Sequence, residues 1–140
     1  MSETPDNSVR FEAITFGVDR DTDTVCVGFE MDRRPDRDSR GLILSRATPE
    51  HSRDHGDGIY VEFGEPQQYG MDGGIASARS TAGHFSIQFT EDGAKQMAGI
   101  RAIEVNYDKD AEVVPDLLNA LDYIFEGFAG YNTDDVRDAD

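Results

Sequence analysis

The feature that most constrains the fold is an alternation of apolar and polar residues with a period of two. It is clearest over residues 25–31, where every second residue from Val25 to Met31 is apolar. Side chains of a strand point alternately to the two faces of a sheet, so this pattern is typical of a strand with one buried face. The alternation recurs, and we expect strands at 9–16, 25–31, 41–46, 58–63, 75–79, 84–90 and 101–107. The polar turn Gly17–Asp23 predicts that the first two strands form a hairpin.

A helical period is present near the C-terminus. Apolar residues between Val114 and Phe128 recur at helical spacing and predict a helix over about 112–127, with Pro115 in its first turn. A shorter helix is expected between Thr90, which can cap it, and Gly99. The pattern therefore predicts an α+β fold: one antiparallel sheet of about six to seven strands, with a short helix and a C-terminal helix packed on one face.

The chain length fits one domain. Its 140 residues predict a single α+β domain over 9–130, a flexible polar N-terminus over 1–8 and a flexible acidic tail over 131–140. No apolar run approaches the roughly 20 residues of a membrane span, and the N-terminus lacks the features of a secretory signal. The single cysteine, Cys26, cannot form an intramolecular disulfide. We therefore expect a cytoplasmic protein without a membrane partner.

The charge is strongly negative: 13 Lys and Arg against 29 Asp and Glu give −16. This balance disfavours binding to nucleic acids and to anionic lipids, which both select basic residues. Two explanations remain open. Adaptation of the whole surface to a salt-rich cytoplasm predicts an even distribution of acids, whereas a face that attracts a basic partner predicts a one-sided distribution.

Two polar segments resemble metal sites. Asp19, Asp21, Asp23 and Glu30 match the acidic positions of a calcium loop, but Thr24 stands where that loop needs glycine and the flanks are predicted strands. We interpret this segment as a hairpin turn.

The segment His51–Asp57 holds two histidines and two aspartates, which could bind zinc or run acid–base chemistry. Gly56 and Gly58 disfavour the helix that would bring His51 and His55 together, so we predict a polar loop. A small metal-binding protein or enzyme using this loop stays an alternative. The chain has no nucleophile elbow, phosphate-binding loop or dinucleotide motif, so we expect no catalytic residue, metal or cofactor.

The middle of the chain carries a set of short motifs. They are Gly41–Arg46, Arg53–Asp54, Gly56–Glu62, Tyr69 and Gly73–Ile75. Together they resemble the immunity protein 10 family of bacterial polymorphic toxin systems. Leu42, Leu44 and Arg46 fit an L-x-L-x-R strand of that family, Asp54 its acidic position, Tyr60 and Glu62 its next strand, and Tyr69 with Gly73–Gly74 its turn if residues 70–72 are an insertion.

The resemblance implies a small, acidic, cytoplasmic α+β protein that protects the producing cell by binding a toxin. We therefore expect a non-enzymatic immunity protein that neutralises a cognate protein toxin, such as a nuclease or another basic enzyme, through an acidic surface. Interfaces are commonly anchored by aromatic side chains amid polar ones. The predicted partner-binding residues are Tyr60, Glu62, Glu65, Tyr69 and Asp72, with Tyr131 as a further aromatic candidate. A salt-adapted acidic interaction domain unrelated to toxins is the remaining alternative.

Overall fold

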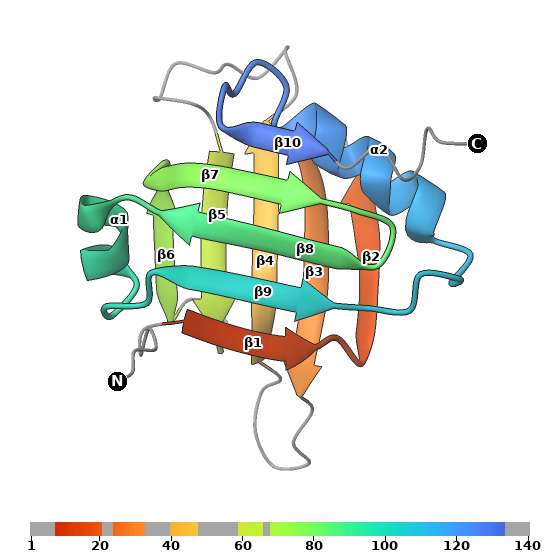
Figure 1. The fold of residues 1–140 in the computed structure, drawn as a ribbon, viewed down its shortest axis with the longest axis horizontal. Helices are drawn as coiled ribbons and strands as arrows, with labels where there is room; N and C mark the ends of the chain where they lie inside the picture. Colours follow the sequence, from red (N-terminus) through yellow and green to blue (C-terminus); the bar gives the residue numbers. More distant parts are fainter. Residues whose placement is uncertain (1–7, 21–23, 33–39, 48–58, 66–67, 134–140) are drawn as a thin grey trace.

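The computed structural model describes residues 8–20, 24–32, 40–47, 59–65 and 68–133. These residues form two five-stranded sheets and two helices (Figure 1). The first, which we name the mixed sheet, has the order β1 (Ser8–Glu12), β9 (Ala102–Asn106), β8 (His84–Phe89), β7 (Ile75–Ser80) and β10 (Tyr131–Thr133). The second, the antiparallel sheet, has the order β2 (Thr15–Arg20), β3 (Thr24–Asp32), β4 (Arg40–Ala47), β5 (Ile59–Gly64) and β6 (Tyr69–Asp72). The helices are α1 (Glu91–Gln96) and α2 (Val114–Ile124).

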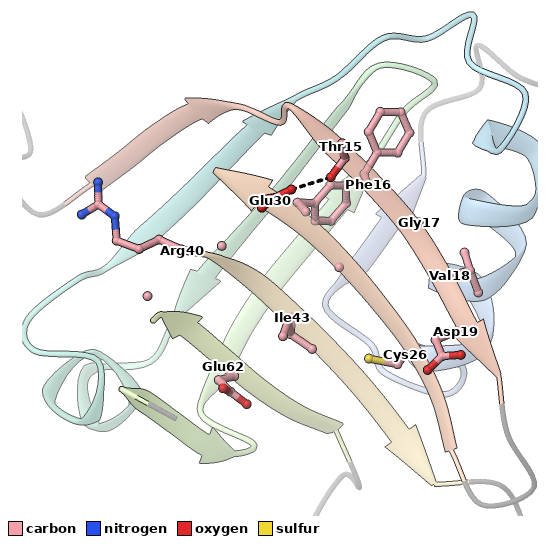
Figure 2. Close-up of a pocket in the computed structure, with 14 residues that line it drawn as sticks. Thr15, Phe16, Gly17, Val18, Asp19, Cys26, Glu30, Arg40, Ile43 and Glu62 are labelled. Atoms are coloured by element: carbon pink, nitrogen blue, oxygen red, sulfur yellow. Dashed lines mark hydrogen bonds between the residues drawn. The ribbon is translucent and has the colours of Figure 1, made fainter. Parts of the chain in front are cut away.

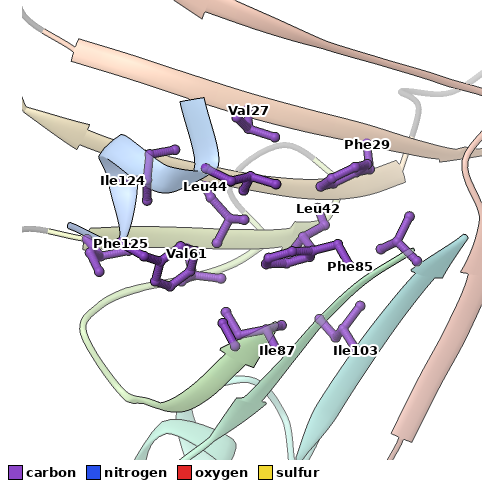
Figure 3. Close-up of a cluster of buried hydrophobic side chains, with 14 of the residues drawn as sticks. Val27, Phe29, Leu42, Leu44, Val61, Phe85, Ile87, Ile103, Ile124 and Phe125 are labelled. Carbon is purple, nitrogen blue, oxygen red and sulfur yellow. The ribbon is translucent and has the colours of Figure 1, made fainter. Parts of the chain in front are cut away.

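The two sheets pack face to face, and the strands of one run across those of the other (Figure 1). Apolar side chains from both inner faces meet between them (Figure 3). Phe29 of β3 and Phe85 of β8 are fully buried, and their rings stack across the interface with centroids 5.7 Å apart. Full burial of such a side chain contributes about 1.5–3 kcal/mol. The alternating strands supply most of the buried side chains of the core.

The chain passes between the sheets at two corners. At the first, Ala13 N–H donates to Asn106 O of the mixed sheet, and the next residue, Ile14, donates to Glu30 O of the antiparallel sheet, both at 2.9 Å. At the second, between β6 and β7, Gly73 and Gly74 have φ angles of +76° and +78°. Only glycine adopts that region without strain, so the double glycine permits the change of sheet.

Both helices follow from local signals. The Thr90 side chain accepts a 2.9 Å hydrogen bond from Gly93 N–H and caps α1, as expected. In α2, Pro115 lies in the first turn, and the apolar stripe packs against β2, β3 and β4. Neither helix of the described residues has the length and apolar character needed to cross a membrane.

The α+β class, the short helix and the C-terminal helix are confirmed, but the single antiparallel sheet is wrong. The period of two shows which face of a strand is buried and says nothing of which strands pair. The predicted strand 9–16 is broken at the first corner, so that β1 pairs with β9 in parallel and only β2 forms the hairpin with β3. The pair β7–β10 is also parallel.

Two segments that were not among the predicted strands contain strands. The glycine-rich segment 65–74, which was given no predicted element, includes β6, which pairs with β5. Tyr131–Thr133, assigned from the sequence to the acidic tail, form β10 beside β7. The rest of that predicted tail, 134–140, and residues 1–7 of the predicted flexible N-terminus lie outside the described residues.

Candidate functional site

A groove of about 470 Å³ lies on the outer face of the antiparallel sheet (Figure 2). It crosses the four strands β2 to β5. Gly17 of β2 and Gly28 of β3 are direct partners across the two strands, and Ile43 of β4 is the partner of Gly28. These three residues form the floor of the groove, which is therefore built from backbone and one aliphatic side chain.

Carboxylates border this floor. Asp19 is paired with Cys26 in the strand register, Glu30 with Thr15, and Glu62 with Ile43. The Thr15 hydroxyl donates a 2.8 Å hydrogen bond to Glu30 Oε1 (Figure 2). The register therefore places an acidic side chain on three sides of the groove.

One arginine also lines the groove, and its charge is engaged locally. Arg40 donates three hydrogen bonds to Asp32: Nε donates to Oδ1 at 3.3 Å and to Oδ2 at 3.1 Å, and Nη2 donates to Oδ2, so both carboxylate oxygens are engaged. These hydrogen bonds raise the pKa of Arg40 above its usual value, and the charges of Asp32 and Glu65 add to the effect. Because Asp32 neutralises the charge of Arg40, this arginine does not offset the other carboxylates, and the face stays acidic.

The outer faces of the two sheets differ in charge. On the antiparallel sheet, besides the Arg40–Asp32 pair at its end, the described outward strand positions carry four acids and no Lys or Arg: Asp19, Glu30, Glu62 and Asp72. On the mixed sheet, the described outward positions carry two arginines and two glutamates: Arg10, Arg79, Glu12 and Glu104. Arg10 Nε lies 3.1 Å from Glu104 Oε1. The acidity of the sheet surfaces is therefore one-sided.

Three of the five predicted partner-binding residues lie together on the acidic face. Tyr60 of β5 is the register partner of Asp72 of β6, and Glu62 follows on the same side of β5. Burial of the Tyr60 phenol raises its pKa above the usual 10.0, and the charges of Glu62 and Asp72 raise it further. Of the three, Glu62 lines the groove itself.

The other two predicted residues lie elsewhere. Tyr69 is the register partner of the buried Phe63 and packs partly buried against the core, so it lies on the inner side of the sheet and not on the acidic face. Residues one apart on a strand face opposite ways, and Tyr69 is on the opposite side from Gly70. Glu65 follows the end of β5, where its backbone N–H donates to Gln68 Oε1 at 2.9 Å.

Tyr131, the further aromatic candidate, has a structural role. Its ring stacks on Phe125 with centroids 4.6 Å apart and an interplanar angle of 8°. Its hydroxyl lies 2.5 Å from Oγ of Ser80, which is fully buried. Tyr131 therefore fastens β10 to the core.

The floor of the groove was missed from the sequence. Gly17 was assigned to a turn, and Gly28 was treated as an ordinary member of the alternating strand 25–31. The available signal was a glycine at an outward position inside a strand, which often marks the close approach of another molecule or backbone. Cys26 lines the groove on the outer face, between the buried Val25 and Val27.

The structure describes only some of the residues in the two segments that resemble metal sites. Asp19 and Glu30 are opposite Cys26 and Thr15, four residues apart along the strand, which is roughly 13 Å at ~3.3 Å per residue. These two carboxylates therefore do not share one ion. Asp21, Asp23 and the whole His51–Asp57 segment lie outside the described residues. Within the described ranges, no three His, Cys, Asp or Glu side chains are grouped so that they could hold a metal.

Comparison with known proteins adds no relative. No protein-family model matches the chain, and no curated protein matches its sequence. The resemblance to the immunity protein 10 family therefore depends on the short motifs between Gly41 and Ile75 alone.

Proposed function

We propose that this chain is a non-enzymatic immunity protein that binds and neutralises a cognate basic protein toxin through the outer face of its antiparallel sheet. The observation that carries the proposal is the difference in charge between the two outer faces. A face of one sign accelerates association with a partner of the opposite sign and disfavours like-charged competitors. The groove lies on this same acidic face, so charge and shape favour one surface.

A salt-adapted surface explains this asymmetry less well. Such adaptation places carboxylates wherever solvent reaches, and so predicts similar acidity on both outer faces. The outer face of the mixed sheet instead balances two arginines with two glutamates. Acids on the helices and connections add to the total charge without bearing on the difference between the sheets: Glu91, Asp92, Asp108, Asp110, Glu112, Asp116, Asp122 and Glu126.

The groove has the chemistry of a recognition surface. Carboxylates that accept hydrogen bonds border an apolar floor, and the Arg40–Asp32 pair fixes one end. Such an arrangement selects positive charge beside apolar surface, which is what a basic protein offers. Interfaces of this kind act by covering the partner, and coverage of an active or substrate-binding surface is sufficient to neutralise an enzyme.

The experiment is co-expression with the protein encoded beside this chain in its genome. We expect growth to be restored and the two proteins to elute as one complex in size-exclusion chromatography. The double substitution Glu30→Gln and Glu62→Gln should slow association at least tenfold, while Glu12→Gln with Glu104→Gln, the same charge change on the mixed sheet, should leave it within twofold. Failure of both rescue and complex formation, or equal losses for the two double variants, would contradict the proposal.

A further inference from the structure

The hollow on the acidic face exists because two strand residues lack side chains. Gly17 and Gly28 face each other in the hairpin of β2 and β3, and neither has a positive φ. A Cβ at Gly17 would meet no atom within 4 Å, and one at Gly28 would meet only Ile43 Cγ1 at 4.0 Å. Glycine inside a strand costs roughly 0.5–1 kcal/mol relative to alanine. Neither backbone conformation nor crowding requires glycine here, so the unfilled space points to a function.

The neighbouring glycine of β4 shows the contrast. A Cβ at Gly41 would collide with the backbone carbonyl of Phe29 and lie 3.1 Å from the Cα of Glu30. Packing between β3 and β4 therefore requires glycine at position 41. The two hairpin glycines have no such requirement.

The floor of the groove beside the two glycines is apolar. Ile43 stands beside Gly28, and its 37% exposure makes it one of two large hydrophobic residues that are exposed among those the structure describes. The single cysteine of the chain, Cys26, lines the same groove. An apolar group that settles over Gly28 would cover Ile43 and gain about 25 cal/mol for each Å² removed from water.

The charges around the hollow determine which side chains must flank that apolar group. Glu62 is paired with Ile43, and Glu30 lies two residues beyond Gly28 on the same face of β3. Carboxylates at this spacing complement an arginine or lysine whose stem packs on apolar surface while its charged end reaches them. At about 470 Å³, the groove lies within the roughly 300–1,000 Å³ of pockets that take a ligand.

We infer that the groove over Gly17, Gly28 and Ile43 is the docking site for a basic amphipathic segment of the partner protein. An apolar side chain of that segment packs over Gly28 against Ile43, and flanking arginine or lysine side chains pair with Glu30 and Glu62. The inference rests on the proposed function, since it names the part of the toxin that this face receives.

The test uses two synthetic twelve-residue peptides, one alternating arginine with leucine and one alternating arginine with serine, titrated calorimetrically at 150 mM salt. The arginine–leucine peptide should bind at least tenfold more tightly than its equally charged counterpart. It should also slow the reaction of Cys26 with a maleimide at least fivefold. Equal affinities, or unchanged thiol reactivity, would overturn the inference.

The sharpest variant is Gly28→Val, which fills the hollow and leaves the net charge unchanged. It should weaken the arginine–leucine peptide at least tenfold, leave the arginine–serine peptide within twofold, and unfold at no lower temperature than the wild type, because valine favours strands. Gly17→Val is the second variant, and Gln88→Val, on the outer face of the mixed sheet, is the matched control. Undiminished binding by both glycine variants would overturn the groove as the docking site.

Different experimental results would contradict the docking site and the proposed function. If the toxin is still neutralised by Gly28→Val with wild-type affinity, the docking site lies elsewhere and the proposed function stands. If the wild-type chain neither protects against the toxin nor binds it, the proposed function fails whatever the peptides do. Full displacement of the arginine–leucine peptide by millimolar spermidine would identify a site for small cations and overturn the inference.

Discussion

Arg46 Nη1 lies 2.7 Å from the carbonyl oxygen of Glu126, just beyond the end of α2. The same nitrogen donates to the carbonyl oxygens of Tyr123 at 3.3 Å and Ile124 at 3.1 Å. The last turn of α2 has no basic residue of its own, so a side chain from β4 supplies the positive charge that the helix C-terminus favours. One arginine thus joins the C-terminal helix to the centre of the antiparallel sheet.

Replacing this arginine should loosen the helix. Arg46→Met keeps an aliphatic stem but removes three hydrogen bonds from a charged donor, and we expect a loss of about 2–4 kcal/mol in the free energy of unfolding. Urea denaturation followed by circular dichroism measures it. Arg101→Met, a change at an exposed position before β9, should stay within about 0.5 kcal/mol. A loss for Arg46→Met no larger than for this control would contradict the role.

This contact also explains one of the motifs from which the family resemblance was drawn. Leu42 and Leu44 are fully buried, and Arg46 is the next residue on the same side of β4. Core packing by the two leucines and the contact of the arginine with α2 therefore account for the L-x-L-x-R pattern in this fold. The Gly73–Gly74 motif has a similar explanation, because it forms the corner between the two sheets.

The alternating pattern predicted burial well and topology poorly. Val27 and Phe29 point inward as expected, since the period of two depends only on the strand itself. The pairing of β1 with β9 joins residues more than ninety positions apart, and no local pattern encodes it. The candidate site was predicted in part: Glu62 was among the predicted partner-binding residues, whereas Gly17 and Gly28 were missed because the hollow arises only when β2 and β3 pair.

Segment 69–72 shows a second limit of the sequence. Gly70 and the nearby Gly73 and Gly74 are typical of a loop, and a loop would expose Tyr69. The open edge of β5 overrides this local preference by offering hydrogen bonds to the backbone of β6. Tyr69 then takes the inward position opposite Phe63.

Gly93→Ala should destabilise the fold although it improves helix propensity. Gly93 in α1 packs against Gly74, and an added Cβ would collide with the Gly74 carbonyl oxygen and lie 3.1 Å from its Cα. Overpacking of this kind costs about 1–3 kcal/mol, which exceeds the ~1 kcal/mol that alanine gains over glycine in a helix. The matched control is Gly28→Ala, where the Cβ enters open space and stability should rise. Thermal melts would contradict the argument if Gly93→Ala raised the melting temperature.

Tyr131→Phe should lower stability without affecting partner binding. The substitution keeps the ring stacked on Phe125 but removes the hydroxyl that lies 2.5 Å from the buried Ser80 Oγ. A buried hydroxyl deprived of this bond costs about 1–3 kcal/mol. A double-mutant cycle with Ser80→Ala measures the coupling by urea denaturation. A coupling near zero, or a weaker complex with the proposed toxin partner, would show that Tyr131 acts otherwise.

Alkaline pH should weaken the fold through Tyr60. Burial of the phenol, followed by the charges of Glu62 and Asp72, raises its pKa in the folded protein above the usual 10.0. Below pH 10 both the folded and the unfolded chain hold the phenolic proton, so in that range this group does not make the stability depend on pH. Between pH 10 and the raised pKa, the unfolded chain has released its proton while the folded chain retains it, so stability falls as pH rises through that window.

Tyr60→Phe should remove this part of the alkaline loss, and urea midpoints between pH 8 and 11.5 measure it. Glu62→Gln should lower the pKa of Tyr60 part of the way toward its usual value, because one of the two neighbouring charges is gone. Absorbance at 295 nm, taken as the difference between each protein and its Tyr60→Phe counterpart, reports that titration. An alkaline decline identical in wild type and Tyr60→Phe would mean that the phenol titrates alike in the folded and unfolded chains.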